Sequence, residues 1–186
     1  MQLSNEKIIE KNGLKFIKLT ANTFNLTFDL NNNNIFVSSI INFDLIQLIC
    51  KLNPNVIENV VINKETETEL NVKINILLKD LFSDLGLPHY YLALNINQTS
   101  YNTNKIVFNC TSFDNKLDSY PDDVELLPIQ NIDISCNTEN KHNVKISCII
   151  DLINNHNIPS FFEKMIGNII YNIFNRLKQF IDNVSF

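Results

Sequence analysis

The chain of 186 residues is poor in glycine and arginine and contains no tryptophan. Its three glycines, Gly13, Gly86 and Gly167, lie far apart, which excludes the glycine-rich loops that hold mononucleotides and dinucleotides. Arg176 is the only arginine, and the 15 basic residues are scattered among 20 acidic ones. Nucleic acid is therefore not an expected partner, because phosphate binding requires a basic stripe.

Long apolar runs are also missing. No uninterrupted apolar stretch approaches the roughly 18 residues of a membrane span, and the polar start from Met1 to Lys11 does not resemble a secretory signal. We expect a protein without a transmembrane segment that is not secreted and resides in the cytoplasm or inside an organelle such as the plastid stroma. Asparagine makes up about a sixth of the chain, which we attribute to an AT-rich genome.

The residues that commonly bind metals show no metal-ligand spacing. The four cysteines form no Cys-x-x-Cys pair, and the three histidines are isolated from one another: Cys50, Cys110, Cys136, Cys148, His89, His142 and His156. We interpret the cysteines as buried thiols, with a metal site or a disulfide as the alternative, and the histidines as solvated or locally bonded. The sequence thus predicts neither a metal nor a cofactor.

Acidic pairs are the nearest approach to a catalytic constellation. Asp80 and Asp84 share a helix face, and Asp122 and Asp123 are adjacent, but neither pair lies in an apolar setting that raises a carboxyl pKa for acid-base work. A cysteine nucleophile paired with His89 has no support in the spacing. We name no catalytic residue and expect a protein that is not an enzyme.

The chain does contain enough apolar residues, 45% of the total, to build a sizeable core. Phe24 to Leu30 alternates apolar and polar residues with the period of a strand, and the turn-forming Asn31 to Asn34 follows. The sequence predicts that this strand forms a hairpin with Ile35 to Ile40.

Alternation and composition predict six further strands: Val56 to Asn63, Leu70 to Ile76, Tyr90 to Asn97, Lys105 to Thr111, Ile129 to Cys136 and Val144 to Asp151. The first two form the clearest hairpin, around the charged turn Lys64 to Glu69. The polar stretch Asp114 to Asp123 contains Pro121 and is expected to be an exposed loop. Residues 1–20 are expected to be a peripheral N-terminal segment.

Two helices and a helical turn are predicted. Asn42 to Leu52 has helical periodicity and stops at Asn53-Pro54, and Lys79 to Gly86 fits a helical turn. A long C-terminal helix begins at Ser160, which has the spacing of a capping box with Glu163. Its apolar residues recur at threes and fours: Phe162, Met165, Ile166, Ile169, Ile173, Leu177 and Phe180. We place Glu163 and Lys164 on the opposite, polar side.

Long runs of consecutive strands favour an α+β fold with an antiparallel sheet and helices on one side. The segments Phe43-Asp44-Leu45-Ile46-Gln47-Leu48, Asn53-Pro54 and Ile158 to Phe180 resemble the START-like, or helix-grip (SRPBCC), superfamily. With Gly167-Asn168, the last segment looks most like its cyanobacterial and plastid branch, DUF1997. The resemblance implies one domain over 1–186, in which a curved antiparallel sheet with a short early helix and a long C-terminal helix across one face encloses a cavity.

Six residues are candidates for a ligand cavity. Tyr90 and Tyr91 follow Pro88 at a junction between loop and strand, where they rim a pocket or an interface or simply pack at an edge. The resemblance implies that Phe161, Phe162, Met165 and Ile169 face the cavity. A solid core is the alternative, and the chain lacks an obvious inward polar cluster.

The preferred hypothesis is a non-catalytic protein that binds a hydrophobic small molecule, similar to a lipid or pigment, between the sheet and the C-terminal helix. The alternative is a structural or assembly protein with a filled core that acts through contacts with a protein partner. A hydrolase or cyclase has only the fold resemblance behind it.

Overall fold

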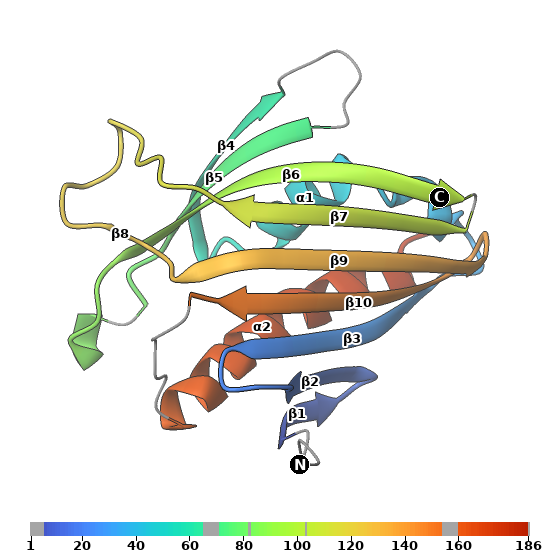
Figure 1. Ribbon diagram of the computed structural model, residues 1–186. Helices are drawn as coiled ribbons and strands as arrows, with labels where there is room; N and C mark the ends of the chain where they lie inside the picture. The colour runs from blue at the N-terminus through green and yellow to red at the C-terminus, as the bar shows by residue number, and fades with distance from the viewer. Residues whose placement is uncertain (1–5, 65–70, 82, 103, 154–159, 186) are drawn as a thin grey trace.

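The computed structural model describes residues 6–64, 71–81, 83–102, 104–153 and 160–185. In these residues a broad sheet forms one layer, and the helices α1 (Phe43–Leu52) and α2 (Ser160–Asn183) lie behind it (Figure 1). The strands before the last helix are β1 (Glu6–Lys11), β2 (Leu14–Lys18), β3 (Thr23–Asn31), β4 (Ile57–Lys64), β5 (Asn71–Leu78), β6 (Tyr90–Asn102), β7 (Lys105–Ser112), β8 (Glu125–Leu126), β9 (Ile129–Asn140) and β10 (Asn143–Leu152). Two short 3-10 helices, η1 (Val37–Ile40) and η2 (Ser83–Leu85), interrupt the connections.

The strand order is β1-β2-β3-β10-β9-β7-β6-β5-β4, and the short β8 pairs with β6. All neighbours along this path are antiparallel, and β8 alone runs parallel to its partner. The first three strands thus form one end of the sheet, next to β10, and β4 forms the other end. The sequence prediction of an α+β fold with an antiparallel sheet, a short early helix and a long C-terminal helix on one face is confirmed.

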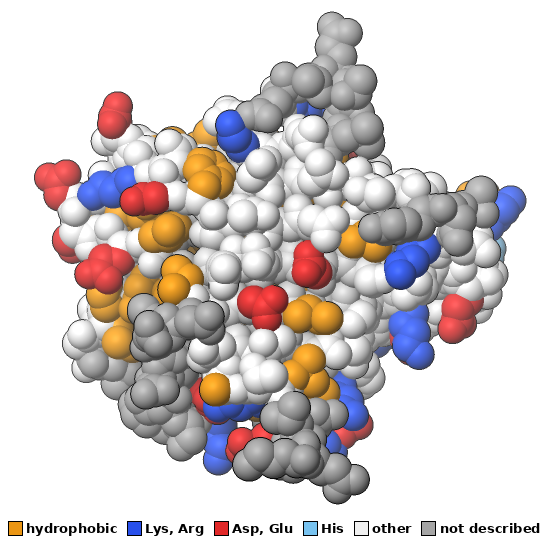
Figure 2. Space-filling model, in the orientation of Figure 1, with side chains coloured by type: hydrophobic (Ala, Val, Ile, Leu, Met, Phe, Trp, Pro, Cys, Tyr) orange, Lys and Arg blue, Asp and Glu red, His pale blue; other side chains and the backbone are white. Residues whose placement is uncertain are grey.

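Strand alternation sorts the abundant isoleucines and asparagines onto opposite faces. Ile134 of β9 faces the helices, whereas Asp133 lies on the outer face and accepts a hydrogen bond of 2.9 Å from the Asn109 amide of β7. The Asn97 amide donates to Asn71 across the next strand pair at 2.8 Å. Figure 2 shows that neutral polar groups cover much of this outer face. The period-two pattern predicted from the sequence therefore separates the two faces of the sheet.

Helix α1 packs on the inner face, and α2 packs on α1 and on β1, β2 and β3. The Phe43 ring of α1 meets the Phe108 ring of β7 edge-on, with centroids 5.9 Å apart. Asn53, which is fully buried, ends α1 and links it to α2, because its amide donates to the carbonyls of Ile49 and Ile173. Both helices therefore share the inner side of the sheet.

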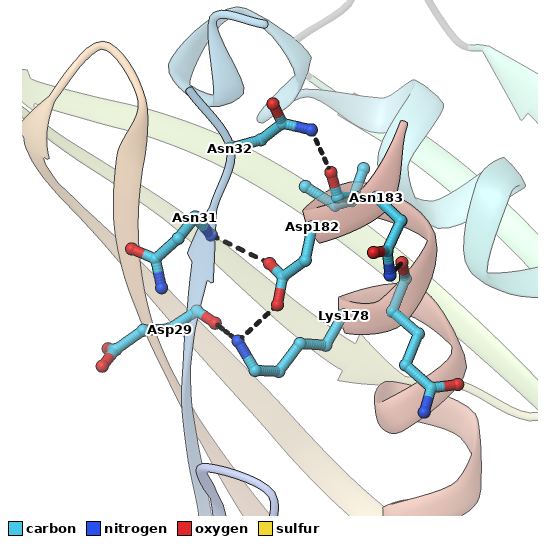
Figure 3. A network of polar contacts seen from close by, with 8 residues as sticks. Asp29, Asn31, Asn32, Lys178, Asp182 and Asn183 are labelled. Atoms are coloured by element: carbon cyan, nitrogen blue, oxygen red, sulfur yellow. Dashed lines mark hydrogen bonds and ion pairs between the residues drawn. The ribbon is translucent and has the colours of Figure 1, made fainter. Parts of the chain in front are cut away.

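The C-terminal end of α2 is bonded to the end of β3 (Figure 3). The Lys178 ammonium donates to the Asp29 carbonyl at 2.6 Å and pairs with the Asp182 carboxylate at 2.9 Å. Asp182 also accepts from the Asn31 backbone N–H, and the buried Asn32 amide donates to the carbonyls of Ile181 and Val184. Carbonyls that the helix end leaves without intrahelical partners are thereby satisfied.

The N-terminal half of α2 packs against the β1–β2 hairpin. A Cβ added to Gly167 would lie 2.9 Å from the Ile8 side chain, so the missing side chain allows this close approach. One turn earlier, the carboxylate of Glu163, only 6% exposed, forms an ion pair with Lys18 of β2. The sequence prediction that placed Glu163 on the polar side of the helix was wrong, because Lys18 provides a partner for the charge inside the fold.

Three other sequence predictions differ from the structure in whole or in part. Ile35 to Ile40 does not form a strand paired with β3: residues Val37–Ile40 form η1, and β3 pairs with β2 and β10 instead. Asp114 to Asp123 is an exposed loop over most of its residues, as expected, but its Tyr120 is buried because the loop folds back onto the outer face of the sheet. Residues 6–18, within the segment expected to be peripheral, form the two strands β1 and β2.

The Glu163–Lys18 pair tests how α2 is held on the sheet. Lys18→Met leaves the Glu163 carboxylate buried without a cation, and we expect it to lower the free energy of unfolding by about 3 kcal/mol in urea denaturation. The double variant Lys18→Met with Glu163→Met removes both charges and should recover most of this loss. Lys15→Met on the exposed face of the same strand is the control. Equal stability of Lys18→Met and the control would contradict a buried pair.

Candidate functional site

The inner face of the sheet is a continuous apolar surface beneath the helices. One row of directly opposed residues runs across six strands: Val72, Ile96, Cys110, Ile132, Ile150 and Phe24. The neighbouring row includes Phe108, Ile134, Cys148 and Leu26. Because opposed residues on paired strands share a face, these rows form one surface.

Burial changes along this surface. Leu26 and Phe28 of β3 and Ile146 of β10 are buried, and the Phe28 ring packs against the tilted ring of Phe174 of α2, with centroids 5.4 Å apart. Farther along the sheet, five inner-face side chains remain half-buried although they pack against the main core: Ile76, Leu92, Ile132, Ile134 and Ile150. We call these five residues the aliphatic strip. It is accessible apolar surface on the side of the sheet that carries the helices.

The Lys18–Glu163 pair lies beside one end of this strip. Lys18 is opposite Phe24 in the β2–β3 pairing, and Phe24 is opposite Ile150 of the strip. The Lys18 ammonium also lies 6.0 Å from the centre of the Phe24 ring. Glu163 is the only buried charged residue in the part of the chain that the structure describes. An otherwise apolar face therefore has a polar but charge-balanced group at its edge.

A second polar group on the inner face is Ser112, at the end of β7. It lies opposite Leu94 of β6, an inner-face position, and two residues beyond Cys110 on the same face. Its hydroxyl is buried and forms no hydrogen bond with the residues that the structure describes. A buried hydroxyl without a partner is costly, so this group is suited to hydrogen-bond a ligand.

The cysteines of the sheet also face inward. Cys110, Cys136 and Cys148 are buried free thiols on three strands, and the sequence interpretation as buried thiols agrees with this placement. Burial raises the pKa of Cys110 and of Cys136 to about 12, and it raises the pKa of Cys148 further. Neutral thiols of this kind contribute apolar surface rather than nucleophiles. Among the described residues, no group of three or more metal-binding side chains occurs.

The structure separates the two predicted tyrosines. Tyr91 lies on the outer face opposite Leu77, in a second apolar cluster with Ala93, Tyr120 and Val124. Its hydroxyl donates to Asp114 at 2.8 Å, and burial with this bond raises its pKa to about 12. Figure 2 shows hydrophobic side chains gathered over this part of the outer face. Tyr91 is therefore not brought to the inner side, whereas Tyr90, its neighbour in β6, alternates toward it.

The predicted residues of α2 are placed only in part. Phe161 and Phe162 lie within the helix, but their side chains are outside the described part of the chain. Met165 and Ile169 are half-buried and do not belong to the main core. The helix instead packs on the core through Ile170, Phe174, Leu177 and Ile181. Contact of Met165 or Ile169 with a ligand stays a prediction.

Lys18, Ser112 and the aliphatic strip were not predicted as site residues. One signal was available for Glu163: it extends the 3-4-3-4 spacing of Gly167, Ile170, Phe174, Leu177 and Ile181, the residues that face the sheet, by a further step of four. Its position in this series points inward. Lys18 and Ser112 have no comparable signal, because strand pairing alone brings them to the inner face.

Among the described residues, no helix has the length and hydropathy that crossing a membrane requires. No family model matches the sequence, and no curated protein matches it either. Solved structures do match. The lipid transfer and protein localization domain of human StarD13 (DLC2) has a TM-score of 0.70 at 9% identity, covering 97% of this chain and 90% of that domain.

Two further structures show the same similarity. Human StAR-related lipid transfer protein 5 has a TM-score of 0.66 at 12% identity, with 97% of this chain and 89% of that one covered. A STAR-related lipid transfer protein from Xanthomonas axonopodis has a TM-score of 0.62 at 9% identity and 94% coverage of both chains. At such low identity the similarity concerns the fold. The chain has the START-like helix-grip fold that its sequence resembles.

Proposed function

We propose that the chain binds a hydrophobic small molecule between the inner face of the sheet and helices α1 and α2, without chemical conversion. The observation that carries this proposal is the aliphatic strip, which keeps accessible apolar surface on the helix-covered side. Ligand sites are concave and mostly apolar, with a few polar groups that orient the ligand. The similar solved domains are named for lipid transfer, which supports a lipid-like ligand class.

The charges favour an uncharged ligand. Lys18 is already neutralised by Glu163, and no other buried charged residue occurs in the described part of the chain. An anionic lipid would have to displace the Glu163 carboxylate or remain unpaired, at a large desolvation cost. The Ser112 hydroxyl and the Lys18–Glu163 pair, at different ends of the strip, suit a neutral molecule with one hydroxyl or carbonyl group.

Filling the strip tests the location of the ligand. Ile134→Trp replaces an aliphatic side chain of the inner face with a bulky indole ring. Ile149→Trp makes the same change on the outer face of the neighbouring strand, where Ile149 is 36% exposed. Native mass spectrometry of the purified protein and titration with a fluorescent neutral lipid measure binding. We expect Ile134→Trp to weaken binding at least about tenfold, or 1.4 kcal/mol, and Ile149→Trp to leave it unchanged.

A fluorescent fatty acid with the same fluorophore and acyl chain as the neutral lipid serves as the charged probe, and it should bind more weakly than the neutral lipid. Circular dichroism spectra of both variants must match the unsubstituted protein, so that lost binding reflects the site. Absence of bound ligand in the purified protein, together with no probe binding, would contradict the proposal and favour the alternative of a filled core.

The cysteines test the absence of nucleophilic chemistry. Because burial raises the pKa of Cys110 and Cys136 to about 12, few thiolates exist near neutral pH. Alkylation by iodoacetamide at pH about 8 should be at least about a hundredfold slower in the folded protein than in urea. Rapid modification of one cysteine in the folded protein would indicate an activated nucleophile and contradict the non-catalytic assignment.

The same thiols predict a loss of stability in alkali. Their pKa is higher in the folded state than in the unfolded chain, where it is about 8.5, so the folded state retains protons that the unfolded state releases. This contribution is complete below the unfolded pKa and is lost as pH rises toward the folded pKa of about 12. Urea midpoints should fall between pH about 9 and 11, and the fall should be shallower in Cys136→Val. An equally steep fall in the Cys136→Val variant would rule out a contribution of the Cys136 thiol to the loss of stability in alkali.

A further inference from the structure

The two end strands of the sheet differ in how their free edges are protected. In β1, four of six residues are charged, namely Glu6, Lys7, Glu10 and Lys11, and its pairing with β2 contains a register shift. Charges and irregular pairing are the usual protection of an exposed edge against pairing with another chain. The β1 edge is therefore protected.

The β4 edge lacks this protection over most of its length. Within the described residues β4 pairs only with β5, and Figure 1 shows it as the last strand on that side. Its charged residues, Glu58 and Lys64, flank the uncharged run Asn59 to Asn63. The irregularity is confined to Ile57–Asn59, and the rest pairs regularly with β5. A regular, uncharged edge of this kind is a template for strand addition.

We propose that the β4 edge binds the β4 edge of a second copy of this chain in antiparallel orientation. A two-fold axis perpendicular to the sheet keeps the inner faces of both copies on the same side, so opposed residues must come from the same face. With the axis at Val61, Asn59 lies opposite Asn63 of the second copy, Val60 opposite Ile62, and Val61 opposite itself, and Glu58, at the register shift, comes next to Lys64. Similar side chains then meet along the regular run Asn59 to Asn63, and opposite charges come together at its ends.

The neighbouring registers lack this complementarity. An axis at Val60 would bring Glu58 next to Ile62, and an axis at Ile62 would place Lys64 opposite Val60. Each would bury a charge against an aliphatic side chain, whereas opposite charges across paired strands stabilise them. The sequence of β4 thus specifies one self-pairing register, and the pairing joins two sheets into one.

The size of the contact sets the expected strength. Stable specific interfaces bury about 1,200–2,000 Å² in total, and one strand edge of eight residues provides less than a typical interface of this kind. The dimer should therefore be reversible and dependent on concentration. A second copy in antiparallel orientation brings its Lys64 to the Glu58 end of β4, whereas a partner of another sequence need not carry a lysine there.

Sedimentation velocity over a concentration series tests the proposal. The unsubstituted protein should shift from the 21.5 kDa of one chain toward twice that mass as concentration rises. Val61→Lys brings two ammonium groups face to face at the axis and should abolish the shift. Ile149→Lys, on the outer face of β10 inside the sheet, makes the same change away from the edge and should leave it intact.

Charge reversal tests the register itself. Glu58→Lys should weaken the dimer, because the new ammonium group comes next to Lys64 of the second copy. Glu58→Lys combined with Lys64→Glu should restore the dimer. Circular dichroism confirms folding of each variant. Any of three outcomes would overturn the proposal. The protein could stay at the mass of one chain throughout the series, or Val61→Lys could leave the dimer intact. In the third, Glu58→Lys abolishes the dimer and the double variant fails to restore it.

Discussion

The arrangement of the fold depends on how α2 is fixed against the first three strands. At the C-terminal end, Lys178, Asp182 and Asn32 bond the last turn to β3, and in the N-terminal half Gly167 and the Glu163–Lys18 pair hold it against the β1–β2 hairpin. Between these points, Phe174 and Leu177 fill the contact. Because both halves of the helix are fixed at one end of the sheet, α2 does not cover the part of the inner face toward β4, and other groups must cover it.

Much of this arrangement could be predicted from sequence because strands and helices have different periods. Phe24 to Leu30 alternates cleanly, and the paired strands, the early helix and the long last helix follow the predicted pattern. Ile35 to Ile40 was wrong for a physical reason: Ser38 and Ser39 interrupt its apolar residues, so it has no strand period, and β3 pairs with β2 and β10 instead. Long-range pairing is not encoded in local spacing.

The site was harder to predict than the fold. In α2, apolar residues occur on several sides, so periodicity indicated a helix but not which flank faces the sheet. The residues that pack on the core are Ile170, Phe174, Leu177 and Ile181, and of these only Leu177 belongs to the predicted apolar series. Tyr91 shows a related difficulty, because alternation defines two faces of a strand without saying which one the helices cover. Lys18 and Glu163 are far apart in the sequence, and only folding brings them into contact.

The dimensions of the layers give a reason why the inner face has room for a ligand. Nine strands lie side by side in the main path of the sheet, and at about 4.8 Å per step they span about 40 Å. A helix is about 10 Å wide, and α1, with ten residues, is only about 15 Å long. The longer α2 packs on β1, β2, β3 and α1 at one end of the sheet, so side chains of the short α1 are left to cover much of the remaining width. The half-buried Ile132, Ile134 and Ile150 are the expected consequence, and a hydrophobic molecule laid on them would complete the core in the way that a third helix would.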